Sequence, residues 1–230
     1  MLGIIGAMDQ EVELIKADMA DVSVMVRAGM EFCQGKLGGK PVVVVKSGIG
    51  KVNAGMCAQI LADVYAVDGI INTGVAGSLC ADINIGDIVL STDAVQHDMD
   101  TAAIGYPVGQ IPGMDTFAFT ADKALADCAE ACCRRVNPEI GVFRGRVVSG
   151  DQFIAGKAKK EWLISTFGGC CAEMEGAAIG QAAYLNNIPF LVIRAISDKA
   201  DDSASMDYPE FQRQAIKHCS RLVKAMVEAL

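Results

Sequence analysis

The hydrophobic pattern along the chain alternates short, continuous apolar runs with segments of helical spacing. Strands buried on both faces are typically continuous apolar runs, whereas amphipathic helices repeat apolar residues every three or four positions. Strands are predicted at residues 2–6, 67–72, 85–93, 142–149, 170–174 and 190–196. Helices are predicted from residue 9, after Gly50, and at 121–136, 176–187 and 206–230. Strands that alternate with helices in this way favour an α/β fold.

Residues 22–46 depart from this alternation because they hold β-type runs with no helix between them. Gly38, Gly39 and Pro41 mark a turn between two of these runs, which indicates a hairpin or meander. We therefore expect a three-layer αβα architecture, with a central mixed β-sheet flanked by helices. Because 230 residues can bury one large core, residues 1–230 are expected to form a single domain.

Polar and charged residues follow two of the predicted strands directly. Glu173 and Glu175 stand where one run gives way to a helix, and Ser197 and Asp198 end the run that carries Arg194. In open α/β sheets, ligands bind beyond the carboxyl ends of the strands, so we expect these side chains to meet at one rim of two adjoining strands. Acids and serine are also common at helix starts, so capping is the alternative for each of them taken alone.

Two segments nearer the amino terminus could reach the same rim. Glu11 lies in the first turn of the helix after the strand at 2–6, where it either faces a ligand or complements the helix dipole. Residues 47–50 form a glycine-rich turn that fits neither the dinucleotide fingerprint nor the P-loop, because Asn53 and Val52 occupy positions that those motifs reserve for other residues. The backbone N–H groups of this turn could still face an anion or a ribose hydroxyl.

Three further loops carry candidate residues. The glycines of the loop 73–78 allow the backbone to approach a ligand closely. Phe153 follows another strand and either fills the core or stacks on a flat ligand. A long loop from residue 94 to 114 is predicted to form a lid or a subunit contact, since structureless loops of about 20 residues are usually functional. Its candidate contact residues are Ile104, Tyr106 and Pro112.

Composition and charge narrow the possible partners. The formal net charge is -8 and the basic residues are scattered, which argues against a nucleic-acid partner. The amino terminus has acids close behind its apolar run and no basic residues ahead of it, unlike a signal peptide. No run approaches the ~20 apolar residues of a membrane span. We therefore expect a cytoplasmic protein with no membrane contact.

The nine cysteines have no metal-binding or disulfide pattern. No Cys-x-x-Cys occurs, the number is odd, and only His97 and His218 could assist as ligands. We interpret the cysteines as small buried hydrophobic residues in a reducing compartment, with a redox or metal role as the alternative. Neither a metal nor a cofactor is expected.

Several carboxylates, one arginine and an aromatic ring at one rim suit a substrate that is polar, hydroxylated and partly flat, such as a nucleoside. Cleaving a glycosidic bond needs one protonated acid for the leaving group and one carboxylate to activate water. Environments that shift the pKa values of two acids in opposite directions decide which acid donates the proton.

Six motifs in order along the chain carry a family resemblance. They are GAMDQEVEL, SGIGKVNAG, NTGVAGSL, SGDQFI, AEMEGAAIG and RAISDKAD. Together they closely resemble the 5'-methylthioadenosine/S-adenosylhomocysteine nucleosidases of the nucleoside phosphorylase superfamily. The resemblance implies a nucleoside phosphorylase-like fold and hydrolytic release of adenine. Asp198 would be the general acid at adenine N7, with Ser197 holding its loop, and Glu11 would activate water with Arg194 nearby.

The resemblance also implies how the substrate is held. Glu175 would bind the ribose hydroxyls, with Met174 packed against the sugar and Glu173 beside it. Phe153 would stack on adenine, and the backbone of Ile154 would read its amino edge. Many relatives have the sequence TGSAG in this loop, whereas this chain has valine where they have serine. Any contact of the loop with the substrate is therefore expected to use backbone N–H groups. The residues of this loop are Val75, Ala76 and Gly77.

The resemblance further implies a homodimer in which the long loop of one subunit closes the 5'-alkylthio pocket of the other. Ile104 and Pro112 would then serve the partner's site, with Ile49, Tyr106 and Tyr208 as further residues around the pocket. Two alternative functions stay open. One is phosphorolysis by a purine nucleoside or methylthioadenosine phosphorylase, although the acidic rim would repel phosphate. The other is a nucleoside-binding protein without catalysis.

Overall fold

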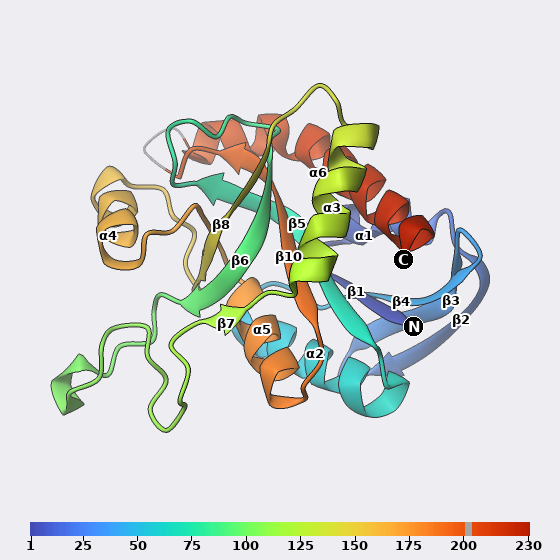
Figure 1. The fold of residues 1–230 in the computed structure, drawn as a ribbon, viewed down its shortest axis with the longest axis horizontal. Helices are drawn as coiled ribbons and strands as arrows, with labels where there is room; N and C mark the ends of the chain where they lie inside the picture. The colour runs from blue at the N-terminus through green and yellow to red at the C-terminus, as the bar shows by residue number, and fades with distance from the viewer. Residues whose placement is uncertain (201–203) are drawn as a thin grey trace.

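A single ten-stranded sheet with helices on both faces organises the described part of the protein (Figure 1). The computed structural model describes residues 1–200 and 204–230, with side chains described up to residue 200 and from residue 211. The sheet contains parallel and antiparallel pairs, so the predicted α/β class with a central mixed sheet flanked by helices is confirmed.

The element bounds agree with most of the predicted segments. The strands are β1 (Leu2–Gly6), β2 (Ala20–Arg27), β3 (Met30–Leu37), β4 (Lys40–Lys46), β5 (Gly69–Ser78), β6 (Ile88–Gln96), β7 (Phe119–Thr120), β8 (Val142–Ser149), β9 (Cys171–Glu173) and β10 (Phe190–Asp198). The helices are α1 (Asp9–Lys16), α2 (Lys51–Tyr65), the 3-10 turn η1 (Ala102–Ile104), α3 (Lys123–Val136), α4 (Lys157–Phe167), α5 (Gly176–Leu185) and α6 (Ala204–Ala229).

Strand β5 connects two parts of the sheet. It pairs in parallel with β10 along one edge, while its other edge pairs first with β1 and then, at Gly77 and Ser78, with β9. On the β1 side the sheet continues through β4 and β3 to β2. On the β9 side it continues through β8 and β6 back to β10, so β5, β9, β8, β6 and β10 form a closed ring.

Two helical layers bury the faces of this sheet. Helices α1, α3 and α6 pack together on one face, where Ile15, Leu125 and Leu222 belong to one apolar cluster with residues of β1, β4 and β10. Helices α2 and α5 cover the other face, where Leu61 and Ile179 belong to a second cluster. A smaller cluster lies beneath α4. Every residue of β10 is buried because this strand is paired on both edges and lies under α6.

The structure corrects two of the predicted segments and adds one helix that was not predicted. Residues 73–78, expected to be a loop, continue β5, because β10 and β9 supply their backbone partners. The strand predicted at 85–93 runs from Ile88 to Gln96, so the long loop predicted from residue 94 begins only after Gln96 and continues to β7. Helix α4 was missed, since its run KAKKEWLISTF carries little helical periodicity. The C-terminal helix is confirmed as a long element.

The expectation of adjoining parallel strands at the rim is also wrong in detail. β9 and β10 do not pair with each other among the described residues, and β5 lies between them. β8 and β9 run opposite to β5 and β10, because β9 is antiparallel to β5 and parallel to β8. The ends of these strands meet because the ring closes. None of the helices in the described ranges is long and apolar enough to cross a membrane.

Candidate active site

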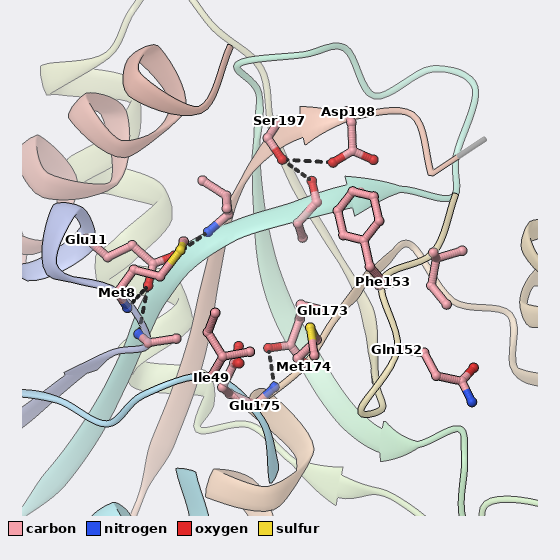
Figure 2. Close-up of a pocket in the computed structure, with 16 residues that line it drawn as sticks. Met8, Glu11, Ile49, Gln152, Phe153, Glu173, Met174, Glu175, Ser197 and Asp198 are labelled. Carbon is pink, nitrogen blue, oxygen red and sulfur yellow. Dashed lines mark hydrogen bonds between the residues drawn. The ribbon is translucent and has the colours of Figure 1, made fainter. Parts of the chain in front are cut away.

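A cavity of about 340 Å³ opens where β1, β5, β9 and β10 come together (Figure 2). Its walls come from the β1–α1 junction, the turn before α2, the second half of β5, the loop after β8, and the ends of β9 and β10. The lining residues are Ala7, Met8, Glu11, Ile49, Val75, Ala76, Gly77, Gln152, Phe153, Ile154, Ala172, Glu173, Met174, Glu175, Ser197 and Asp198.

Glu11 lies at the start of α1 and turns its carboxylate into the cavity (Figure 2). Oε2 accepts hydrogen bonds from the backbone N–H groups of Ala7 at 2.7 Å and Met8 at 3.0 Å. Oε1 accepts one from the N–H of Val75 at 3.2 Å. Burial raises the pKa of Glu11, and the positive charge of Arg194 together with these hydrogen bonds offsets only part of that rise.

Arg194 lies behind the cavity wall and does not line it. Its Nη2 donates to Glu173 Oε2 and, over 2.6 Å, to Asn72 Oδ1, and it lies 3.5 Å from Glu175 Oε2. The side chains of Arg194 and Glu173 are each only 2% exposed, so this ion pair is fully buried. Burial lowers the pKa of Arg194, but the charges of Glu173, Glu175 and Glu11 outweigh that effect and raise it. The guanidinium therefore stays positive beneath three carboxylates.

The carboxylate of Glu173 accepts hydrogen bonds from several protein groups besides Arg194. Ser149 donates its hydroxyl to Oε1, and the N–H groups of Gly176 and Glu175 donate to the same carboxylate at 2.8–3.1 Å. Burial raises the pKa of Glu173, but the charge of Arg194 and these hydrogen bonds outweigh it, so the pKa is lowered. Glu173 is thus a fixed negative charge that orients its neighbours.

Glu175 has a different environment although it lies two residues away. Its Oε1 accepts a hydrogen bond from the N–H of Gly50 at 2.9 Å. Burial, and then the negative charge of Glu173, raise the pKa of Glu175 to about 7, against the opposing effects of Arg194 and the Gly50 hydrogen bond. Near neutral pH this carboxyl group can therefore either donate or accept a hydrogen bond.

Asp198 ends β10 at the far side of the cavity from Glu11 (Figure 2). Its Oδ2 accepts a hydrogen bond from Ser197 Oγ at 2.9 Å, and its Oδ1 accepts one from the N–H of Ala200 at 2.8 Å. A β-carbon at Gly77 would lie 2.7 Å from Asp198 Oδ1, so glycine is needed where β5 passes this carboxyl group. The carboxyl group of Asp198 is consequently fixed at the cavity wall.

Apolar side chains complete the cavity. Phe153 and Met174 lie between the acidic groups in the close-up, and Ile49 lies above Glu175 (Figure 2). Phe153 is 52% exposed and Ile49 is 53% exposed, so the cavity is open on their side. Ile154, in contrast, is buried in the cluster beneath α4, which anchors the loop that carries Phe153.

Twelve of the seventeen predicted site residues line this one cavity, four do not, and the side chain of one lies outside the described residues. Arg194 contacts it only through the acids, and the side chain of Tyr208 lies outside the described residues. The other three residues lie exposed on the loop after β6, away from the cavity: Ile104, Tyr106 and Pro112.

Sequence reasoning missed four lining residues, which are Ala7, Met8, Gln152 and Ala172. Ala7 and Met8 follow β1 directly, so the rule on strand ends that selected Glu11 also pointed to them. Within the described ranges, no group of three or more His, Cys, Asp or Glu residues could hold a metal ion.

Comparison with known proteins places this site in a family. Residues 1–228 match the family model described as the phosphorylase superfamily. A 5'-methylthioadenosine/S-adenosylhomocysteine nucleosidase of Anoxybacillus flavithermus is 41% identical over 230 residues, which cover 100% of this chain and 98% of the relative. The chain belongs to the phosphorylase superfamily, among its 5'-methylthioadenosine/S-adenosylhomocysteine nucleosidases. The resemblance stated from the six motifs is confirmed.

Solved structures agree with this membership in the nucleosidases. The nucleosidase of Neisseria meningitidis, solved in complex with methylthio-immucillin-A, superposes with a TM-score of 0.95 at 35% identity, covering 100% of this chain and 99% of that chain. A futalosine hydrolase of Helicobacter pylori superposes with a TM-score of 0.94 at 32% identity, covering 100% of this chain and 97% of that chain. The same fold therefore carries both of these named activities.

Proposed function

We propose that this protein hydrolyses the N-glycosidic bond of 5'-methylthioadenosine and S-adenosylhomocysteine, releasing adenine and 5-methylthioribose or S-ribosylhomocysteine. The observation that carries the proposal is the placement of Glu11 and Asp198 on different sides of one cavity, with Phe153 at its open side. This arrangement supplies one carboxyl group for the leaving base, one for water, and a flat ring for the purine.

Asp198 acts as the general acid in this proposal. Protonating adenine at N7 lets the base leave as a neutral molecule, which lowers the barrier to breaking the bond. Ser197 and the N–H of Ala200 hold the carboxyl group in position, so little reorganisation is needed when the proton moves.

Glu11 positions and deprotonates the attacking water. Its raised pKa makes it a stronger base than an exposed glutamate, and three backbone N–H groups fix its orientation. Arg194 behind the wall balances the charge of the carboxylates that surround the ribose. No covalent intermediate is needed, because water attacks the sugar directly.

Glu175 binds the ribose hydroxyls, and Met174 packs against the sugar. A carboxyl group with a pKa near neutrality can accept hydrogen bonds from two hydroxyls once the positive charge on the sugar favours its ionised form. Glu173 keeps Glu175 and the start of α5 in place through the two backbone N–H groups that it binds. Phe153 stacks on adenine, and the backbone of Ile154 reads its amino edge.

A second copy of the chain completes the pocket. The loop that carries η1 projects from the body of the protein (Figure 1), and its Ile104 is 70% exposed. Tyr106 and Pro112 on the same loop are also exposed, and the cavity is open beside Ile49. We propose a homodimer in which this loop covers the 5'-alkylthio end of the partner's substrate. Each copy would act as one domain of residues 1–230, located in the cytoplasm.

Adenine release from 5'-methylthioadenosine in phosphate-free buffer tests the function. Rapid release, with none from inosine, is the expected result. Release only after phosphate is added, with a ribose 1-phosphate product, would establish phosphorolysis instead. Tight binding with no product would indicate a nucleoside-binding protein. Because a futalosine hydrolase shares the fold, 6-amino-6-deoxyfutalosine is assayed in parallel.

Asp198→Asn tests the general acid. Turnover should fall by about 10²- to 10⁴-fold, because asparagine cannot donate the proton. Asp127→Asn on α3 is the matched control, since Asp127 lies outside the cavity. Near-normal turnover of Asp198→Asn, with the control also active, would remove Asp198 as the acid.

A further inference from the structure

Two of the nine cysteines meet beside the cavity wall. Cys80 follows β5 and Cys170 precedes β9, and their Sγ atoms lie 3.6 Å apart although the residues are 90 positions apart in sequence. The N–H of Leu79 donates to the carbonyl of Cys170 at 2.9 Å, which extends the antiparallel pairing of β5 with β9. The backbone therefore holds the two thiols side by side.

The environment of this pair differs from that of the core cysteines. Cys57 and Cys171 are fully buried, whereas Cys80 and Cys170 are both partly exposed. The thiol of Cys170 occupies the space beside Gly145 of β8, where any β-carbon would overlap it. Both residues of the pair are thus partly exposed to solvent, and Cys170 is confined to a position facing Cys80.

We propose that Cys80 and Cys170 form a reversible disulfide when the protein meets a small-molecule disulfide such as oxidised glutathione. A thiolate of the pair attacks the reagent, forming a mixed disulfide and releasing one glutathione thiolate, which takes up a proton. The second cysteine loses its proton and attacks the protein sulfur of the mixed disulfide, which releases the second glutathione. Two protein thiols are oxidised, and one small disulfide is reduced to two thiols.

The disulfide would tie the end of β5 to the start of β9. Gly77 and Ala172, which are paired in register on these strands, line the cavity, whereas neither cysteine does. The link should therefore stabilise the cavity wall without blocking it. It closes a long loop between residues 80 and 170, the situation in which a cross-link restricts the unfolded chain most.

The rate of linkage should rise with pH. Burial, and then the neighbouring Cys80, raise the pKa of Cys170 to about 12, so its reactive thiolate is scarce at neutral pH. Linkage that requires the Cys170 thiolate is thus expected to be slow at pH 7 and to become faster as the pH rises.

The test exposes the reduced, folded protein to oxidised glutathione at pH 8. We expect a loss of two free thiols, a non-reducing peptide map that joins the Cys80 and Cys170 peptides, and reversal by dithiothreitol. The midpoint of thermal unfolding should rise by about 5 °C or more. Adenine release from methylthioadenosine should change less than twofold.

Serine variants separate this pair from the other thiols. Cys80→Ser and Cys170→Ser should each abolish the link and the thermal shift, whereas Cys128→Ser, which alters a partly exposed cysteine on α3, should keep both. Glutathione that stays attached to Cys80 without a Cys80–Cys170 peptide would overturn the proposal. So would a link between other cysteines, or no loss of thiols. Because thiol counts and peptide maps do not depend on turnover, these results are separate from the test of nucleosidase activity.

Discussion

The backbone N–H of Gly50 donates a hydrogen bond to Glu175 Oε1 over 2.9 Å, across 125 positions of sequence. Gly50 has a φ of 96° and ends the turn before α2, a conformation that favours glycine. The bond fixes Glu175 at the cavity wall and links the turn at 47–50 to the start of α5. A turn that matched no nucleotide-binding motif thus contributes the Gly50 N–H and the Ile49 side chain to the site.

Glu175 should make the protein less stable as the pH rises. Its pKa is raised from 4.5 to about 7, so between these values the folded state holds a proton that the unfolded chain releases. Stability is therefore greatest below pH 4.5 for this group and is lost as the pH rises through 7, by on the order of 3 kcal/mol. Glu175→Gln should reduce that decline. Urea unfolding at pH 5 and pH 8 measures the difference.

Glu11 contributes in the same direction, because its pKa is also raised, so the decline should not vanish in Glu175→Gln. Glu13→Gln, at an exposed position on α1, is the control and should leave the pH dependence unchanged. An unaltered decline in Glu175→Gln would show that this carboxyl group does not titrate in that range.

Gly74→Ala should damage both stability and activity. A β-carbon at Gly74 would lie 2.6 Å from Arg194 Nη1 and 2.6 Å from Glu11 Oε1, so both side chains would have to move. We expect a loss of about 1–3 kcal/mol in the free energy of unfolding, and a lower kcat. Gly55→Ala is the matched control, because nothing lies within 4 Å of its β-carbon position. On helix α2 that substitution should stabilise by about 0.5–1 kcal/mol. Equal effects of the two substitutions would contradict the crowding at Gly74.

Arg194→Leu should be among the most destabilising single substitutions. It leaves Glu173 charged and buried without its cation, which typically costs about 3–5 kcal/mol in the free energy of unfolding. Chemical unfolding measures this loss, and circular dichroism checks that the variant folds. Lys36→Met removes an exposed ion pair with Asp21 and should leave the urea midpoint unchanged. A midpoint for Arg194→Leu near that of the wild type would mean that Glu173 takes up a proton at little cost.

Phe153→Ala should weaken substrate binding more than folding. The ring is half exposed, so its removal should change the free energy of unfolding by less than about 1 kcal/mol. Loss of stacking on the purine should raise KM by about tenfold or more, since base–aromatic stacking contributes about 1–3 kcal/mol. Phe153→Tyr keeps the ring and should retain most of the affinity. A KM that stays unchanged in Phe153→Ala would remove the stacking role.

Local sequence patterns predicted most strands and helices and the acidic residues that follow the strands, because these features depend on the spacing of neighbouring residues. Glu11, Glu173, Glu175 and Asp198 were selected because each follows an apolar run, and the structure brings all four to one cavity. The direction of β8 and β9 could not be predicted, because the same apolar runs fit parallel and antiparallel neighbours. The continuation of β5 through Gly74 and Gly77 depends on partners distant in sequence.

The cysteines show the same limit. Nothing in their spacing paired Cys80 with Cys170, because the contact arises only when β5 meets β9. Likewise, the exposure of Ile104 follows from how far its loop extends beyond the body of the protein, which no local pattern encodes. The contact between these two cysteines therefore depends on the pairing of strands that are distant in sequence, which local patterns do not predict.

The closed ring of β5, β9, β8, β6 and β10 also constrains when the protein can work during its synthesis. Among the described strands, β10 is the last to leave the ribosome, and it is the one that pairs with both β5 and β6. A nascent chain that ends before residue 190 lacks both that closure and Asp198. The cavity can therefore form only after nearly the whole chain has been translated, so substrate cannot assist the folding of earlier segments.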